Sequence, residues 1–112
     1  MVNKYIPDRG DIVLLDFDPQ AGKEQVRKRP AIVISPRIYN SKVGLAVFCP
    51  ITSQIKGYPF EFLLPEKLKT RGAVLTDHVK NLDWKSRNAV FLERLPGSYM
   101  VEVLERIRLL LD

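Results

Sequence analysis

Cysteine and histidine are nearly absent from this 112-residue chain, which has one of each, Cys49 and His78. A lone cysteine excludes an internal disulfide and any zinc site built from several cysteines. Cys49 lies in the apolar run 45–50, where we expect a small buried hydrophobic residue. The chain also lacks internal repeats and low-complexity tracts. We therefore expect one domain over residues 1–112, with a single modest core.

Long apolar runs are missing as well. No stretch approaches the roughly 20 apolar residues that a membrane-spanning helix requires. The N-terminal segment, residues 1–11, contains no apolar signal region. We therefore expect a cytoplasmic protein with no membrane partner.

Positive charge is in excess, with a formal net charge of +5 at pH 7. Such a balance is compatible with a polyanionic partner. The basic residues gather in two segments: Lys23, Arg27, Lys28 and Arg29 in the first, and Lys67, Lys69 and Arg71 in the second. These segments either line one groove that follows a nucleic-acid backbone or form two separate solvated loops.

Short apolar and β-branched runs predict a mainly β protein. We expect strands at residues 11–17, 31–35, 45–52, 60–64, 73–75 and 88–92. Pro50 is expected to confine the third strand to a sheet edge or a bulge, because proline cannot donate to a ladder. Between the strands we expect one helical turn at 36–40, a tight turn at 41–44 and an irregular segment at 76–84.

The C-terminal segment has the pattern of an amphipathic helix. Apolar residues recur at three- and four-residue steps, namely Met100, Val103, Leu104, Ile107, Leu110 and Leu111. Ser98 is the expected N-cap. Five or six short strands and one C-terminal helix predict a small, strongly curved antiparallel barrel that the helix plugs or flanks.

Residues 22–35 join a basic loop to an apolar strand. Pro30 biases Arg29 toward an extended conformation at the lip of this strand, which is a suitable place for an anion-binding guanidinium. Glu24 on the same loop either steadies Arg29 or acts as a base. From the residues alone, the simpler alternative is favoured: a surface arginine paired with Glu24 or Asp16.

Thr52 ends the third predicted strand. Its hydroxyl either donates to a phosphate and shuttles a proton, or satisfies its own turn, which is the more frequent arrangement. The loop that follows carries Gln54, Lys56 and Tyr58. These side chains offer base-edge, phosphate and stacking contacts to single-stranded RNA, or they belong to a solvated turn.

A metal site is not expected. Asp16 and Asp18 form a single Asp-x-Asp pair, Glu24 follows on the loop, and no further ligand lies nearby in the sequence. We therefore predict no metal ion and no cofactor.

Four motifs, in this order, resemble the MazF/PemK family of toxin endoribonucleases. They are D-x-G-D-I-V-x-x-D-F-D-P at 8–19, G-x-E-Q-x-x-x-R-P-A-x-V-x-S at 22–35, P-x-T-x-Q-x-K-G-Y-P-F-E at 50–61 and D-x-V-K at 77–80. The resemblance runs from Tyr5 to about Trp84, and the final third is similar only in pattern. It implies an SH3-like barrel of the CcdB, Kid and MazF type and a homodimer.

The resemblance also implies an activity: metal-independent, sequence-specific cleavage of single-stranded RNA. In this reaction the ribose 2′-hydroxyl attacks the adjacent phosphate and leaves a cyclic phosphate and a free 5′-hydroxyl. Arg29 occupies the family's catalytic arginine position, and the base, the acid and the cation that the reaction needs are all obtainable from Glu24, Thr52 and Arg29, with the acid and the base not assigned to particular residues. The RNA-binding residues that the resemblance implies are Lys23, Lys28, Gln54, Lys56, Tyr58, Asp77 and His78.

Two positions depart from the family's pattern. His78 follows Asp77 where relatives often have glutamine, so we treat it as an RNA contact and assign it no proton transfer. Leu75 stands where some relatives have a catalytic arginine. The chain therefore resembles the branch that relies on glutamate, arginine and threonine.

The implied natural partner is an antitoxin whose acidic, disordered tail folds across the basic groove and blocks RNA entry. Two other functions suit a barrel of this kind. One is a CcdB-like toxin that binds gyrase and cuts nothing, and the other is a non-catalytic SH3-like adaptor.

Overall fold

The computed structural model describes residues 4–17 and 28–112. Glu24, Lys23 and Asp18 lie outside the described residues. The elements in chain order are β1 (Asp11–Asp16), β2 (Lys28–Val33), α1 (Arg37–Val43), β3 (Ala46–Thr52), β4 (Glu61–Leu63), β5 (Ala73–Leu75), β6 (Lys80–Leu82), β7 (Val90–Arg94) and α2 (Gly97–Leu109). The prediction of a mainly β fold with a C-terminal helix is confirmed.

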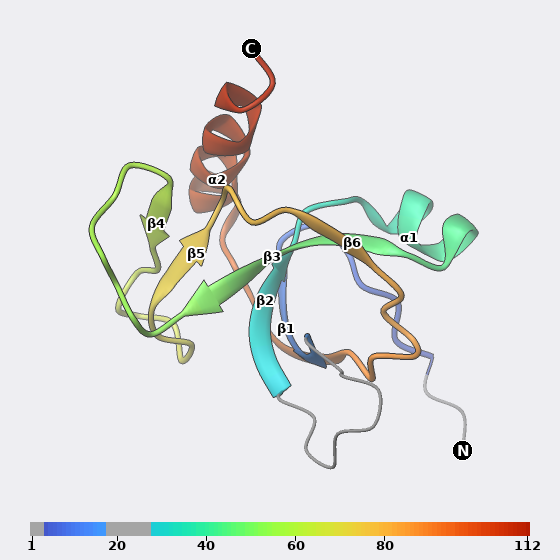
Figure 1. Ribbon diagram of the computed structural model, residues 1–112. Coiled ribbons are helices and arrows are strands. Elements are labelled where there is room, and N and C mark those ends of the chain that lie inside the picture. Colours follow the sequence, from blue (N-terminus) through green and yellow to red (C-terminus); the bar gives the residue numbers. More distant parts are fainter. Residues whose placement is uncertain (1–3, 18–27) are drawn as a thin grey trace, which may run out of the picture.

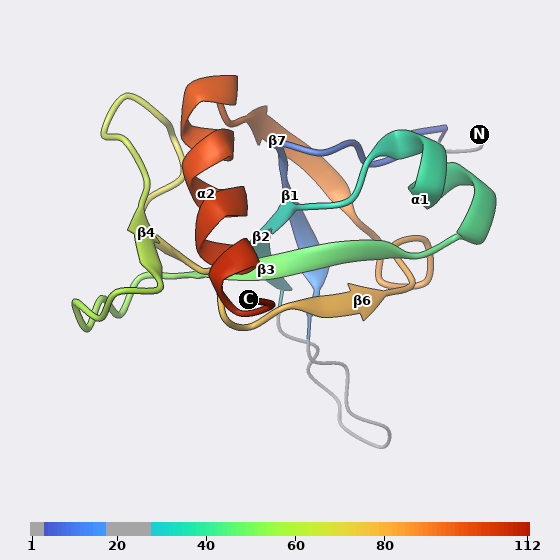
Figure 2. The same cartoon turned by 90° about the horizontal axis from the view of Figure 1, so that it is seen from above.

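The strands form one curved antiparallel sheet in the order β4-β5-β3-β2-β1-β7, and β6 pairs with β3. Figures 1 and 2 show β4 and β5 at the same end of the molecule as α2, whereas α1 lies at the other end. β3 connects these two regions. Its residues 46–48 pair with β6, its residues 48–50 pair with β2, and its last two residues pair with β5.

Of the two alternatives expected for Pro50, a sheet edge or a bulge, the edge is therefore wrong, because β3 has neighbours on both sides. Pro50 pairs with Ala31 of β2. On its other side it lies between Phe48, the last residue paired with β6, and Ile51, the first paired with β5. A proline is tolerated there because neither β5 nor β6 pairs with it on that side.

Several other boundaries differ from the expected ones. Residues 80–82 form β6 instead of irregular structure, since their backbone pairs with residues 46–48 of β3 although K-N-L is a weak strand sequence. The single helical turn and the turn at 41–44 are together one helix, α1, which ends at left-handed Gly44. Pro96 is the N-cap of α2, without a side-chain capping bond, so the prediction for Ser98 is wrong.

Side chains of the inner strands alternate between two hydrophobic clusters. Ile12, Ile32 and Cys49 belong to the cluster that α2 covers, whereas their neighbours Val13 and Val33 belong to the other. This alternation follows from the two-residue period of a strand. Burial, with a smaller effect of the Asp77 charge, raises the pKa of the Cys49 thiol to about 12. As expected, this thiol acts as a small buried hydrophobic group.

Helix α2 lies across one face of the sheet (Figure 2). Met100 and Val103 are buried against the core, and Leu104 and Ile107 pack at its border. The predicted apolar stripe is longer than the buried one, because Leu110 and Leu111 are 44% and 82% exposed. Within the described residues, neither helix has the length and apolar character to cross a bilayer.

Candidate active site

A solvent-facing pocket of about 440 Å³ lies where the ends of β2 and β3 separate. It is lined by Arg29, Pro30, Ile51, Thr52, Ser53, Gln54 and Arg71. Two of these side chains are guanidinium groups, and none of them is acidic. The described lining is thus suited to an anion with several oxygen acceptors.

The sheet register explains why Arg29 and Thr52 meet. Ala31 pairs with Pro50, which is the last pair between β2 and β3. Continuing this antiparallel register by two residues sets Arg29 across from Thr52. β3 then leaves β2 and pairs with β5 through Thr52 and Ala73. The two strands diverge at this point, and both side chains line the opening between them.

Thr52 combines the two alternatives that its sequence position allowed. Its Oγ1 accepts a hydrogen bond from the Gln54 backbone N–H at 3.0 Å, so the hydroxyl does stabilise the turn. A hydroxyl oxygen that accepts one bond still has its own hydrogen to donate. The same bond holds Gln54 at the pocket. Thr52 can therefore donate to an anion in the pocket without breaking the turn.

Arg29 forms no ion pair with any residue in 4–17 or 28–112. Asp16, one of its expected partners, binds Lys28 Nζ at 3.1 Å and Asn88 Nδ2 at 2.9 Å. The Asn88 hydrogen bond lowers the pKa of Asp16, and the Lys28 ammonium lowers it further, against the opposing effect of desolvation. Because consecutive strand residues point to opposite faces, Lys28 lies away from the Arg29 pocket.

The other predicted RNA-binding residues form a second cluster. The Tyr58 hydroxyl donates to Asp77 Oδ1 at 2.6 Å, and His78 Nε2 lies 3.8 Å from the same oxygen. The hydrogen bond to Asp77 raises the pKa of Tyr58 to about 12, so the phenol is neutral at physiological pH. Glu61 holds the loop between β3 and β4, which carries Lys56 and Tyr58. Its carboxylate accepts the backbone N–H groups of Lys56 and of Gly57.

The structure thus divides the predicted site. Arg29, Thr52 and Gln54 share one pocket, Tyr58, Asp77 and His78 share a polar cluster, and Lys28 is paired elsewhere. Arg71 was noted only as part of a basic segment, and no local sequence signal places it beside Thr52. Only the pairing of β3 with β5 brings it there.

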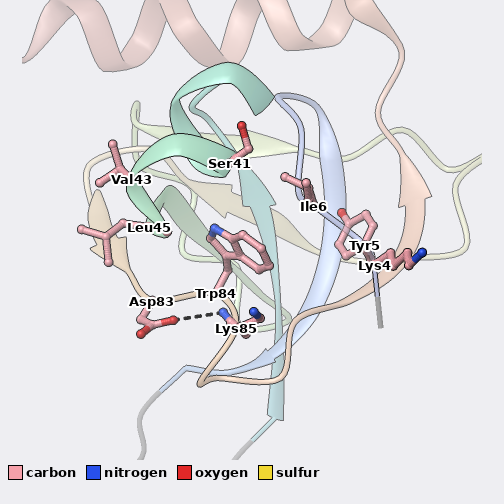
Figure 3. A pocket seen from close by; sticks show the side chains of 10 residues that line it. Lys4, Tyr5, Ile6, Ser41, Val43, Leu45, Asp83, Trp84 and Lys85 are labelled. Carbon is pink, nitrogen blue, oxygen red and sulfur yellow. Dashed lines mark hydrogen bonds between the residues drawn. The ribbon is translucent and has the colours of Figure 1, made fainter. Parts of the chain in front are cut away.

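A larger pocket of about 680 Å³ lies between α1, the N-terminal segment and residues 83–85 (Figure 3). Trp84 forms its central wall and donates from Nε1 to the Asn40 carbonyl at 3.1 Å. None of the predicted site residues in the described part of the chain lines this pocket. Its lining combines apolar side chains with Lys4, Lys85 and Asp83, so it differs from the described Arg29 pocket in holding a carboxylate beside its cations.

Comparisons with known proteins identify one family. Residues 8–111 match the family described as PemK-like, MazF-like toxin of type II toxin–antitoxin system. The endoribonuclease toxin MazF of Escherichia coli K12 is 47% identical over 89 residues, covering 80% of this chain and 79% of the relative. The endoribonuclease PemK of Escherichia coli is 35% identical over 109 residues, covering 93% and 81%.

A solved structure of a similar protein has the same fold as this chain. The crystal structure of MazE–MazF from Deinococcus radiodurans superposes with a TM-score of 0.90 and 49% identity, covering 96% of this chain and 97% of that chain. The family match includes β2, β3 and the loop that carries Arg71, so it contains the whole described pocket. The chain therefore belongs to the PemK-like, MazF-like toxins of type II toxin–antitoxin systems.

Proposed function

We propose that this chain is a metal-independent endoribonuclease toxin that cuts single-stranded RNA in the pocket between Arg29 and Thr52. The observation that carries the proposal is the pocket itself. A half-buried guanidinium with no described carboxylate partner lies across from a hydroxyl that can donate to an anion. The endoribonuclease relatives support the reaction class.

In the proposed reaction the ribose 2′-oxygen attacks the adjacent phosphorus, and the bond from phosphorus to the 5′-oxygen breaks. The products are a 2′,3′-cyclic phosphate and a 5′-hydroxyl. Arg29 binds two phosphate oxygens and stabilises the charge that develops on them in the transition state. Thr52 donates to the phosphate. Of Thr52 and Glu24, one takes the proton of the attacking 2′-hydroxyl and the other gives a proton to the leaving 5′-oxygen.

Four other predicted residues, namely Gln54, Tyr58, Asp77 and His78, select and hold the RNA. Gln54 lies at the pocket edge, where its amide can read a base edge. The Tyr58 ring offers a stacking surface, and its hydrogen bond to Asp77 fixes the hydroxyl end. His78 adds a polar contact beside them. These contacts give the sequence selectivity of the proposed reaction.

Thr52→Val is expected to lower kcat about 100-fold, because it keeps the shape of the side chain but removes both the donor to the phosphate and the acceptor of the Gln54 N–H. Thr52→Ser, which keeps the hydroxyl, should remain within about fivefold of the unmodified protein. Single-turnover cleavage of a defined RNA measures both variants. A Thr52→Val variant that cuts at the full rate would remove Thr52 from the mechanism.

A chelator experiment separates the enzyme from the gyrase-binding and adaptor alternatives. The purified protein is mixed with a long RNA in excess EDTA, and cut sites are mapped by primer extension. We expect discrete cuts and products with 5′-hydroxyl ends. A protein that arrests growth without cutting RNA would instead favour the CcdB-like binding toxin.

We further propose that the protein acts in the cytoplasm and is neutralised there by an antitoxin with an acidic, disordered tail. The MazE–MazF complex of Deinococcus radiodurans supports such a pairing. The described lining of the Arg29 pocket has two guanidinium groups and no acid. A tail carboxylate would compete there with an RNA phosphate.

The proposed functional unit is a homodimer joined through the end of α2. Leu109, Leu110 and Leu111 are all exposed, although apolar residues elsewhere on this helix pack on the core. We expect Leu111→Glu to raise the dimer dissociation constant about 30-fold, the effect of losing about 2 kcal/mol at an interface. Cleavage should fall with it, because two protomers share the RNA.

Light scattering at several concentrations measures this dissociation. Ile38→Glu is the matched control, since Ile38 is 67% exposed on α1 at the other end of the molecule. A protein that is monomeric at every concentration contradicts the homodimer. A dimer that tolerates Leu111→Glu as well as Ile38→Glu contradicts its placement at α2.

A further inference from the structure

We propose that Arg71 binds a second RNA phosphate, adjacent to the one that is cut, and thereby sets which bond lies between Arg29 and Thr52. This inference rests on the proposed function of the pocket. Arg71 lines the same pocket as Arg29, is exposed, and forms no ion pair within the described residues. Within the part of the chain that the structure describes, its guanidinium has no carboxylate partner, and it lies in a pocket suited to anions.

The sheet places Arg71 on the opposite side of Thr52 from Arg29. On one side, the register between β2 and β3 sets Arg29 across from Thr52. On the other side, Thr52 pairs with Ala73, and continuing that register sets Arg71 across from Gln54. Arg29 and Arg71 thus lie on opposite sides of β3, two strand spacings apart and offset by two residues along it, which sets their backbones about 12 Å apart. This separation favours two different phosphates over one shared phosphate.

The backbone around Arg71 is fixed on both sides. The Glu93 carboxylate of β7 accepts the N–H groups of Lys69 at 3.1 Å and Thr70 at 2.6 Å. On the other side, the Gly72 carbonyl accepts the Leu64 N–H at 3.0 Å. The side chain of Arg71 therefore projects from a rigid base. A rigid base reduces the ordering cost of binding a phosphate.

Gly72 makes the approach to Thr52 possible. Its φ is +122°, and a Cβ at this position would lie 2.2 Å from the Thr52 carbonyl oxygen. Only glycine allows β5 to approach β3 this closely. The residue before it, Arg71, is consequently held beside the proposed reacting groups.

The other cations of the same segment do not share this position. Lys67 Nζ lies 5.5 Å from the centre of the Tyr99 ring, beside α2. Lys69 is exposed and does not line the pocket. Of the two basic segments in the sequence, each contributes one arginine to the described pocket wall. Among the described cations of these segments, Arg29 and Arg71 line one pocket, whereas Lys28, Lys67 and Lys69 do not.

Binding measurements with two charge-matched variants test the proposal. The probe is an RNA that the protein cuts, made with 2′-O-methyl groups so that no nucleophile is present. Arg71→Gln should weaken binding about tenfold and reduce the slope of log K against log salt by about 0.7, the loss of one phosphate contact. Lys69→Gln removes the same charge two residues away and should change affinity less than about twofold.

A neutral phosphate locates the contact. One methylphosphonate is placed in turn at each phosphate around the cut. In the unmodified protein, neutralising the phosphate next to the cut should weaken binding about tenfold. In Arg71→Gln the same change should have almost no effect, since the partner is already missing. A full effect at every position in Arg71→Gln would overturn the assignment.

The outcomes separate this inference from the proposed function. If Arg71→Gln and Lys69→Gln bind alike while Thr52→Val is inactive, only the second phosphate site is wrong. If Thr52→Val and Arg29→Ala both cut RNA at the full rate, the proposed active site itself is wrong. Thermal unfolding of Arg71→Gln should match the unmodified protein, because this side chain is exposed and unpaired with any described residue.

Discussion

Arg29→Ala is expected to lower the rate of RNA cleavage about 1,000-fold, because it removes the group proposed to stabilise the charged transition state. The protein should stay folded. Arg29 is only half-buried and lies at the end of the β2 ladder, outside both hydrophobic clusters. Single-turnover cleavage and urea unfolding, measured on the same preparation, test the two parts of this expectation.

Two further variants make the Arg29 experiment specific. Arg29→Lys keeps the charge and loses the bidentate fork, so its rate should lie between those of Arg29→Ala and the unmodified protein. Lys28→Ala removes the adjacent charge, which points to the other face and is paired with Asp16 at 3.1 Å. It should change the rate less than about threefold. Equal losses in Arg29→Ala and Lys28→Ala would indicate a general charge effect and contradict the site.

Gly72→Ala is expected to lower the free energy of unfolding by about 4 kcal/mol, from backbone strain together with steric overlap. The added Cβ would lie 2.2 Å from the Thr52 oxygen and 2.9 Å from its carbonyl carbon, both backbone atoms of β3. β5 must therefore move away from β3, which also carries Arg71 away from Thr52. Urea unfolding measures the stability, and RNA cleavage should fall as well.

Gly44→Ala separates the two causes. Gly44 also has a positive φ, +81°, but an added Cβ there would meet no atom within 4 Å. Gly44→Ala should therefore lower the free energy of unfolding only by the cost of the positive φ, about 1 kcal/mol. If Gly72→Ala is as stable as Gly44→Ala, then β3 and β5 do not approach as closely as the structure indicates, and the placement of Arg71 fails with it.

The comparison of β1 and β6 shows how far local sequence predicts this fold. β1, D-I-V-L-L-D, is apolar and β-branched, and it lies where the pattern predicts it. β6, K-N-L, carries no such pattern. It forms because its backbone pairs with residues 46–48 of β3. Strand propensity describes a side chain that fits a half-buried surface, so it fails where the partner strand alone makes the strand.

Helix α2 shows a different limit of prediction from sequence, namely how far along a helix its apolar face is buried. The spacing of its apolar residues correctly identifies one buried stripe. The same spacing continues into Leu110 and Leu111, which are exposed. Periodicity indicates which face of a helix is apolar, but how far the neighbouring core extends along that face depends on the other elements.

The candidate site also combines residues that the sequence predicts with one that only the structure places. Arg29, Thr52 and Gln54 were identified from motifs, and the structure places them in one pocket. Glu24 and Lys23 lie outside the described residues, so their roles remain predictions. Arg71 was not assigned to the site from the sequence, because it lies 19 residues beyond Thr52 and reaches the pocket only through strand pairing.

By itself, the order of residues determined the family and the mainly β architecture with its terminal helix, and it supplied the residues that we predict for the site. Those properties follow from local patterns and from motifs that are contiguous in the chain. The register of β2 and β5 on β3, the isolation of Lys28 by Asp16 and the arrival of Arg71 beside Thr52 were decided only by tertiary structure. Each depends on hydrogen bonding and close contact between segments far apart in sequence, which no local pattern encodes.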